Sequence, residues 1–371
     1  MAEQNREKDN REIDNKEIDN KEIDNKETDT EKEVEKEVIL EVRDVKKWFP
    51  NTAKSKEFIK AVDGVSLSIR KGETFGLVGE SGCGKSTLAR LILSLYKATA
   101  GDVFFHGKPI YKMNARQLRE VRREMQVIFQ DPYEALDPYL TIEEIIMEPL
   151  DIHQYGTKQE KREKVEEMCS LVGLPVNLLT RMPHQLSGGQ RQRVNIARSL
   201  ALNPEFVICD EAVSALDVSV QAQILNLLRH LQKELGLTYL FISHNLSVVK
   251  YISDTIGVMY FGHLVEVAPK NELFAAVKHP YTHALLSAVP LPDPDYQVNT
   301  GALTGDVPSL LNPPSGCIFH ERCPYKQERC GREAPVLESV TACHQVACHR
   351  YKELTLKLDY SSGFGKGGEG R

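Results

Sequence analysis

Short apolar runs bounded by polar and glycine residues recur through the middle of the chain. Runs of this length predict strands, and they occur at residues 38–42, 65–69, 74–78, 126–129, 206–209 and 239–242. Helical patterns occur at residues 86–95 and 158–171. Because strands alternate with helices, the pattern predicts an α/β fold with a mainly parallel sheet.

The pattern changes twice along the chain. Strand signals stop between about residues 131 and 185, which predicts a helical subdomain inserted into an ordered body spanning residues 38–270. After residue 270 the chain becomes rich in Pro, Cys and His, so we expect a C-terminal extension over residues 271–351. The Gly-rich end, residues 352–371, is expected to be a flexible tail.

The first residues of the chain hold most of its net charge. Acidic residues outnumber basic ones in residues 1–38, and this excess accounts for the net charge of -6. The same segment repeats Asp-Asn-Lys-Glu-Ile, a period that fits neither a helical nor a strand face. We predict that residues 1–37 form a disordered acidic tail, either a tolerated low-complexity extension or a tether. The near-neutral remainder favours neither nucleic acid nor an anionic surface as a partner.

Apolar segments and cysteines bear on the cellular location. No apolar stretch reaches the length of a membrane-spanning helix, and the Glu/Lys-rich start lacks the apolar core of a secretory signal. We therefore expect a cytosolic protein. That compartment keeps thiols reduced, so the eight cysteines are not expected to form structural disulfides.

A phosphate-binding loop follows the predicted strand at residues 74–78. The pattern G-x-x-x-x-G-K-[ST] is satisfied by Gly79, Gly84, Lys85 and Ser86. Glycines let successive backbone N–H groups point at phosphate oxygens, and the helix that starts there adds its positive dipole end. Lys85 would reach the β- and γ-phosphates of ATP, and Ser86 would bind Mg²⁺. Further nucleotide-binding residues expected in this loop are Ser81, Gly82 and Thr87.

The predicted strand at residues 206–209 ends in two acids, Asp210 and Glu211. A carboxylate at a strand end beside the phosphate loop can hold the Mg²⁺ shell, which is the role predicted for Asp210. The adjacent Glu211 would orient or deprotonate the attacking water. Cys83 and Cys209 are interpreted as small packing residues rather than reactive thiols.

Six short motifs occur in the order seen in ABC ATPase domains, which the chain resembles from about residue 38 to residue 267. They are the phosphate loop, Gln130, residues 186–190 (Leu-Ser-Gly-Gly-Gln), the Asp210–Glu211 pair, residues 214–217 (Ser-Ala-Leu-Asp) and His244. The resemblance implies a P-loop ATPase fold with an antiparallel β subdomain and an inserted helical subdomain. It also implies an ATP site that closes only where two nucleotide-binding domains meet head to tail.

The resemblance assigns roles around the catalytic carboxylates. Gln130 resembles the glutamine that contacts Mg²⁺ and senses the transmembrane partner. His244 resembles the histidine that contacts the γ-phosphate and helps to hold Glu211. Two positions depart from the usual pattern: Ala212 and Asn245 stand where a proline and an acid are common. Neither change removes a catalytic group.

The resemblance also assigns roles across the dimer interface. Ser187 and Gly189 resemble signature residues that cap the γ-phosphate of ATP on the opposite subunit, again with a helix N-terminus aimed at an anion. Asp217 belongs to a loop that crosses the same interface. Phe49, or Trp48 beside it, resembles the aromatic residue that stacks on adenine.

The C-terminal part resembles the extension of peptide/nickel-class importer ATPases. The resemblance rests on residues 279–286, 305–309 and 312–317, while residues 127–132 and 291–295 are similar to the F-type oligopeptide/dipeptide subunit. It implies a related D-type ATPase as partner in a heterodimer. It also implies two transmembrane permease subunits, an indirect link to a substrate-binding protein, and a place on the cytoplasmic face of the membrane.

Four cysteines of the extension, Cys317, Cys323, Cys330 and Cys348, have the spacing C-x₅-C-x₆-C-x₁₇-C. So many thiols in a short cytosolic segment indicate a metal or cluster site. Zinc is an alternative, with nearby histidines as possible ligands. Cys343 is a fifth thiol in the segment, which leaves the assignment of the fourth ligand open. Reduced thiols without any ligand remain a third interpretation. The resemblance favours a [4Fe-4S] cluster. The histidines concerned are His320, His344 and His349.

These features predict the ATP-hydrolysing motor of an importer for dipeptides or oligopeptides. An importer is favoured over an exporter because no membrane span is fused to the chain. Import of nickel or another small solute is an alternative, because the sequence does not specify the cargo. A second alternative is an ABC ATPase that acts on ribosomes or DNA, but such proteins usually have two nucleotide domains or a long coiled coil, and this chain has one phosphate loop.

Overall fold

The computed structural model describes residues 37–51, 57–288, 313–356 and 358. The predicted acidic tail, all but its last residue, lies outside these ranges, and so does most of the predicted Gly-rich tail. Residues 291–295 and 305–309, which support the resemblance to importer ATPases, also lie outside them.

The largest sheet of the described residues has the strand order β11-β12-β10-β9-β3-β8-β7-β6. Strands β9, β3, β8, β7 and β6 are parallel to one another, and β10, β11 and β12 are joined antiparallel. The mainly parallel core and its predicted strands are therefore confirmed. The bounds are β3 (Thr74–Val78), β6 (Met125–Ile128), β7 (Phe206–Asp210), β8 (Thr238–Ile242), β9 (Thr255–Tyr260), β10 (His263–Pro269), β11 (Glu338–Ser339) and β12 (Gln345–Val346).

A second, antiparallel sheet has the order β2-β1-β4-β5. The predicted strands 38–42 and 65–69 are parts of much longer strands, which pair along most of their length. Register shifts near Val45 and Trp48 interrupt the simple alternation there, which explains why the sequence pattern revealed only one end of each strand. The bounds are β1 (Val38–Pro50), β2 (Phe58–Arg70), β4 (Ala100–Phe105) and β5 (Lys108–Pro109).

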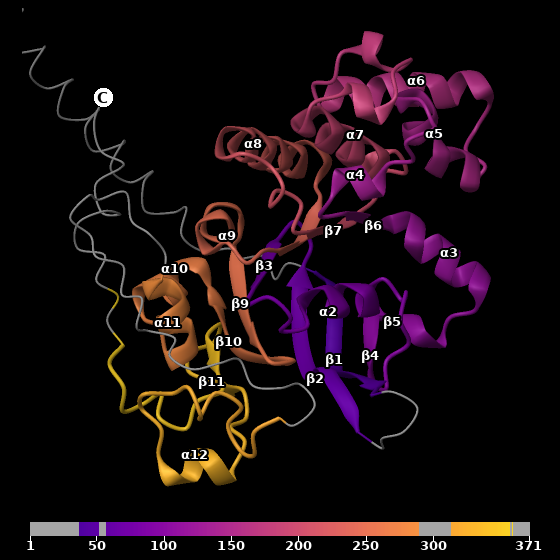
Figure 1. The fold of residues 1–371 in the computed structure, drawn as a ribbon. Coiled ribbons are helices and arrows are strands. Elements are labelled where there is room, and N and C mark those ends of the chain that lie inside the picture. Colours follow the sequence, from indigo (N-terminus) through magenta and orange to yellow (C-terminus); the bar gives the residue numbers. More distant parts are fainter. Residues whose placement is uncertain (1–36, 52–56, 289–312, 357, 359–371) are drawn as a thin grey trace, which may run out of the picture. The chain divides into compact units, whose positions relative to one another are not determined.

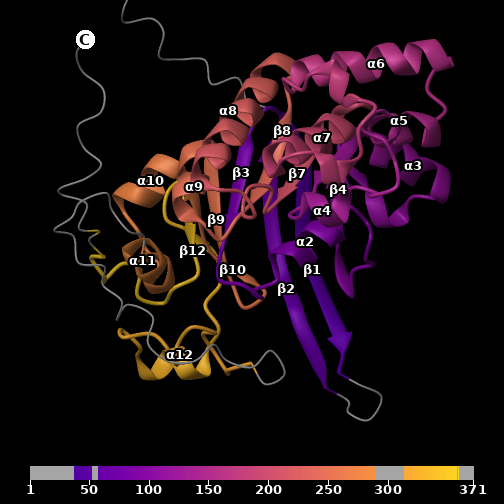
Figure 2. The same cartoon turned by 45° about the horizontal axis from the view of Figure 1, so that its top comes forward.

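Helices cover both faces of the large sheet (Figures 1 and 2). Successive residues of β7 alternate between two cores: Val207 and Cys209 pack with the helical subdomain side, whereas Phe206 and Ile208 pack with α2 and the antiparallel sheet. The bounds are α2 (Lys85–Ile92), α3 (Ala115–Glu124), α4 (Pro132–Ala135), α5 (Ile142–Ile152), α6 (Lys158–Leu171), α7 (Gly188–Leu200), α8 (Val218–Leu235), α9 (Leu246–Ile252), α10 (Lys270–Ala275), α11 (Pro280–Ser287) and α12 (Glu328–Arg332), with 3₁₀ turns η1 (Ile110–Lys112), η2 (Val176–Leu178) and η3 (Pro183–Gln185).

Both predicted helices are present. Helix α6 has the predicted bounds, and α4, α5 and α6 lie in the segment predicted to be helical. Helix α2 ends earlier than predicted, because Leu93 caps it and Ser94 adopts a φ of 52° that breaks the helical geometry. In the described ranges no helix combines the length and apolar character that a membrane span requires.

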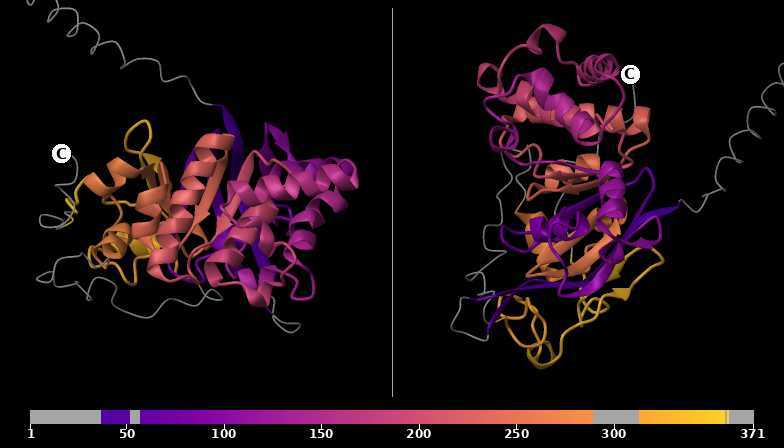
Figure 3. Two further views of the ribbon diagram at one scale, coloured as in Figure 1. Left: turned by 90° about the horizontal axis from the view of Figure 1, so that it is seen from above. Right: turned by 90° about the vertical axis from the view of Figure 1, so that its right-hand side faces the viewer.

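The C-terminal segment joins the large sheet directly. Strand β12 pairs with β10 through Val346 and Glu266, so residues far apart in the sequence share one sheet (Figure 3). The start of the predicted flexible tail, residue 352, is too early: Leu354 and Leu358 pack against the core and Leu356 is buried in it. These leucines bury apolar area that a solvated tail would leave exposed.

Candidate ATP site

The phosphate loop, residues 79–87, connects β3 to α2 and requires glycine at two positions. Gly84 has a φ of 108°, and a Cβ there would lie 2.1 Å from the carbonyl oxygen of Ala61. A Cβ on Gly79 would lie 2.1 Å from the carbonyl oxygen of Met259. The loop is thus held against β2 and β9 by close backbone packing that any side chain would disrupt.

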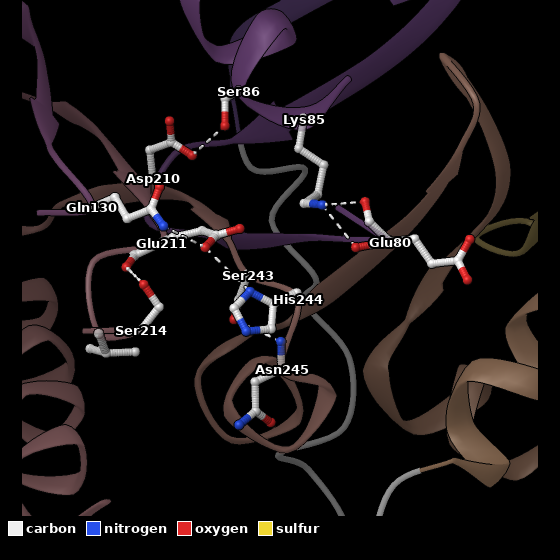
Figure 4. Close-up of polar contacts among 12 residues, drawn as sticks. Glu80, Lys85, Ser86, Gln130, Asp210, Glu211, Ser214, Ser243, His244 and Asn245 are labelled. Carbon is white, nitrogen blue, oxygen red and sulfur yellow. Dashed lines mark hydrogen bonds and ion pairs between the residues drawn. The ribbon is translucent and has the colours of Figure 1, made fainter. Parts of the chain in front are cut away.

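Lys85 begins α2, and its ammonium group is folded back over the loop (Figure 4). Its Nζ donates hydrogen bonds to the carbonyl oxygens of Gly79, at 2.8 Å, and Glu80, at 2.9 Å. The lysine is almost fully buried. A cation held in this way beside backbone N–H groups forms a site for a phosphate chain.

Ser86 and Asp210 meet between the loop and the end of β7. The Ser86 hydroxyl donates a hydrogen bond of 3.1 Å to Asp210 Oδ1. Burial raises the pKa of Asp210, and the hydrogen bond from Ser86 partly opposes this shift. A hydroxyl and a carboxylate are the hard oxygen donors that Mg²⁺ prefers, so this pair fits the ion.

Glu211 accepts two contacts at one carboxylate oxygen. Gln130 Nε2 donates to Glu211 Oε2 at 3.1 Å, and His244 Nδ1 lies 3.2 Å from the same oxygen (Figure 4). Glu211 has a φ of 50°, which is uncommon for a residue with a side chain and indicates a backbone held by its surroundings. The structure therefore brings together three side chains from three separate strand ends.

The signature residues begin helix α7. The Ser187 hydroxyl accepts a hydrogen bond from the Gln190 N–H, and the Gln190 side chain accepts one from the Ser187 N–H, which forms a capping box. At Gly189 a Cβ would approach Val220 to 2.7 Å. Asp217 caps α8 by accepting a hydrogen bond from the Val220 N–H, and its hydrogen bonds with Ser219 and Val220 lower its pKa.

The residues predicted to lie at an interface stand apart from the chain's own phosphate loop. Within the described residues, no hydrogen bond or ion pair joins Ser187, Gly189 or Asp217 to Lys85 or Ser86. The Ser187 side chain is exposed. The N-terminus of α7 is therefore accessible from solvent.

The two aromatic candidates for adenine stacking differ in their surroundings. Phe49 meets Tyr96 edge to face, with ring centroids 5.7 Å apart. Trp48 donates its indole N–H to Asp63 at 3.2 Å and has Lys60 over its ring. Both rings lie near the end of β1 and both are only partly buried.

The four predicted cysteine ligands line a single small pocket: Cys317, Cys323, Cys330 and Cys348. Burial, together with the nearby thiols of the other three cysteines, raises the pKa of Cys317 to about 12. Cys343 is exposed and does not line this pocket. In the described part of the chain, no group of three or more His, Cys, Asp or Glu side chains is placed to hold a single metal ion.

The three candidate histidines have other partners. His344 is buried and pairs with Glu266 at 2.8 Å, on the β10 side of the extension. His320 contacts the Cys317 carbonyl oxygen through Nδ1, and His349 contacts the Glu333 carbonyl oxygen through Nε2. Of the three, His320 and His349 line the cysteine pocket and His344 does not.

Two features of the site were not predicted from the sequence. Asn245, which replaces an acid common at this position, caps α9 by accepting hydrogen bonds from the N–H groups of Ser247 and Val248. Glu80, inside the phosphate loop, pairs with Arg322 of the C-terminal extension. No periodicity or motif in the sequence links residues so far apart.

Comparison with known proteins agrees with this geometry. The family described as "ABC transporter" matches residues 62–214, and the family described as "Oligopeptide/dipeptide transporter, C-terminal region" matches residues 265–330. The oligopeptide transport ATP-binding protein OppF of Escherichia coli (strain K12) is 52% identical over 320 residues, covering 85% of this chain and 95% of the relative. AppF of Bacillus subtilis (strain 168), described in the same words, is 51% identical and covers 85% and 98%.

A solved structure shows the same fold. It is the dimeric post-hydrolysis state of the ATP-binding cassette MJ0796 bound to ADP and Pi, which superposes with a TM-score of 0.57 at 31% identity and covers 62% of this chain and 98% of that one. Fold and site thus define an ABC-type P-loop ATPase. The chain belongs to the family of ATP-binding proteins of oligopeptide/dipeptide ABC transporters. It is accordingly an ATP-hydrolysing enzyme.

Proposed function

We propose that this chain is the motor subunit of a membrane importer for dipeptides or oligopeptides. The observation that supports this most is the group beside the phosphate loop in which Gln130 donates to Glu211 and His244 contacts the same carboxylate oxygen. Glu211 acts on the attacking water, and His244 and Gln130 fix its carboxylate. Gln130 also leads into the segment that faces the membrane subunits, so hydrolysis is coupled to their movement.

Each nucleotide is held between two ATPase subunits. Lys85, Ser86 and Asp210 bind the phosphates and Mg²⁺ on this chain, while the partner provides a signature helix to cap the γ-phosphate. In return, Ser187 and Gly189 of this chain cap the ATP of the partner, for which the open N-terminus of α7 is suited. The partner in this proposal is a related D-type ATPase.

The membrane subunits contact the segment around α4 and α5. Exposed aromatic residues gather there: the exposed fraction is 85% for Tyr139 and 63% for Tyr133. Amphipathic aromatic side chains of this kind are typical of protein interfaces. This contact would place the chain on the cytoplasmic face of the membrane, bound to two permease subunits and linked through them to a substrate-binding protein.

The cargo is proposed to be a peptide because the relatives are described as oligopeptide transport proteins. Uptake of a radiolabelled tripeptide should fall to background in a strain that lacks this gene and return with the wild-type gene on a plasmid. Nickel uptake, measured in the same strains, should not change. If nickel uptake fell and peptide uptake did not, the cargo would be the metal rather than a peptide.

The four thiols of the extension are proposed to hold a [4Fe-4S] cluster. Their shared pocket supports this, because such a cluster binds one thiolate at each corner. The ligands are Cys317, Cys323, Cys330 and Cys348, which leaves the exposed Cys343 outside the site. The cluster would supply a covalent cross-link between segments of an extension that has little regular secondary structure.

Protein purified without oxygen should be brown, with a broad visible absorbance and about four iron atoms per chain. The Cys330→Ala variant should lose iron and colour, whereas the matched Cys343→Ala variant should keep both. A colourless wild-type protein with one zinc per chain would support the zinc alternative. Protein with neither metal would support free thiols.

A further inference from the structure

We propose that Arg322 is a positioning residue for ATP binding, which neutralises and orients Glu80 inside the phosphate loop. The proposal deepens the one above, since it rests on residues 79–87 being the nucleotide loop. Arg322 Nη1 donates to Glu80 Oε2 at 2.8 Å, and Nη2 donates to Glu80 Oε1 at 3.1 Å. Two parallel hydrogen bonds fix both the position and the plane of the carboxylate.

The pair is largely removed from water. The side chain of Arg322 is 5% exposed and that of Glu80 is 23% exposed. Arg322 also donates through Nη1 to the Tyr260 hydroxyl, at 3.4 Å. Because a partly buried charge without a partner is unfavourable, removing either side chain would leave the charge of the other uncompensated.

A second contact holds the backbone of the same loop residue. The Glu80 N–H donates to the Tyr281 hydroxyl at 3.0 Å. Tyr281 packs against Tyr260 and Phe319, with ring centroids 4.5 Å and 5.4 Å away. Phe319 precedes Arg322 by three residues. One short segment of the extension therefore both pairs with the Glu80 carboxylate and packs against the tyrosine that binds the Glu80 N–H.

Charge explains why the loop needs Arg322. A carboxylate in a phosphate-binding loop repels the triphosphate, and the repulsion is stronger in a partly buried site than in water. Figure 4 shows the Glu80 carboxylate pointing away from Lys85, whereas the Glu80 carbonyl oxygen accepts the Lys85 ammonium. Arg322 holds the negative charge on the outer side of the loop and cancels it.

The test measures the dissociation constant of a fluorescent ATP analogue for the full-length chain. In the Arg322→Met variant the Glu80 charge has no partner, so the dissociation constant should rise about tenfold or more. Adding Glu80→Gln to this variant removes the repelling charge. The double variant Arg322→Met/Glu80→Gln should therefore recover an affinity within about threefold of the wild type.

A control variant shows whether the effect is specific to Arg322. Arg332→Met breaks the exposed pair between Arg332 and Glu328 in the same extension and should leave nucleotide affinity unchanged. Thermal unfolding of every variant shows whether it is folded.

Two results would overturn the proposal. One is a folded Arg322→Met variant with wild-type nucleotide affinity. The other is a double variant that binds no better than Arg322→Met alone, because the loss would then come from a disordered extension rather than from the Glu80 charge. Neither result bears on the ATP site itself, which the Lys85→Ala variant tests separately.

Discussion

Replacing Glu211 by glutamine should stop turnover while leaving ATP bound. Glutamine keeps the size of the side chain and can still contact Gln130 and His244, but it cannot accept a proton from water. The loss of a general base lowers turnover by about 10²–10⁴-fold. With ATP still held, the two nucleotide-binding domains should stay together.

The trapped state can be measured by size exclusion with ATP and Mg²⁺. The Glu211→Gln variant mixed with the proposed partner ATPase should elute as a dimer, and the wild type as separate subunits. The exposed residue Glu234 on α8 provides a matched control, since Glu234→Gln should behave as the wild type. If Glu211→Gln hydrolysed ATP at the normal rate, Glu211 would not be the base.

The Lys85→Ala variant should lose both ATP binding and turnover. Its ammonium donates hydrogen bonds within the loop to the carbonyl oxygens of Gly79 and Glu80, where it can reach a bound phosphate chain. Removing one preorganised electrostatic group from a reacting phosphate lowers turnover by about 10²–10³-fold. Phosphate release, measured with purified protein and Mg²⁺-ATP, gives the result directly.

A neighbouring lysine serves as the control for this variant. Lys97 is exposed and lies beyond α2, so Lys97→Ala should retain turnover and nucleotide affinity. The comparison separates the loss of a phosphate-binding cation from a general loss of positive charge. Undiminished turnover in Lys85→Ala would show that the loop is not the nucleotide site.

Local patterns predicted the elements that position the site. The apolar run 74–78, followed by Gly79, Gly84 and Lys85, specified β3, the loop and the start of α2, because each of these has its own short-range signal. The grouping of Gln130, Glu211 and His244 was predicted by the resemblance rather than by spacing. The parallel sheet then brings their strand ends together.

Contacts over long sequence separations could not be predicted in this way. The Arg322–Glu80 pair and the pairing of β12 with β10 depend on how the extension packs against the rest of the chain. No local sequence pattern indicates this packing. The same limit applied to the cysteines: spacing left Cys343 and the histidines as possible ligands. Only the packed structure shows that His344 pairs with Glu266 instead.

Coupled transport tests the account most directly. The chain, the proposed partner ATPase, the two permease subunits and the binding protein would be reconstituted in vesicles with ATP on the side of the ATPases. Labelled tripeptide should accumulate with the wild-type chain, and ATP hydrolysis should rise when the peptide-loaded binding protein is added; with Glu211→Gln both should be lost. Peptide accumulation that persisted with Glu211→Gln, or hydrolysis indifferent to peptide, would contradict the role of this chain as the motor of a peptide importer.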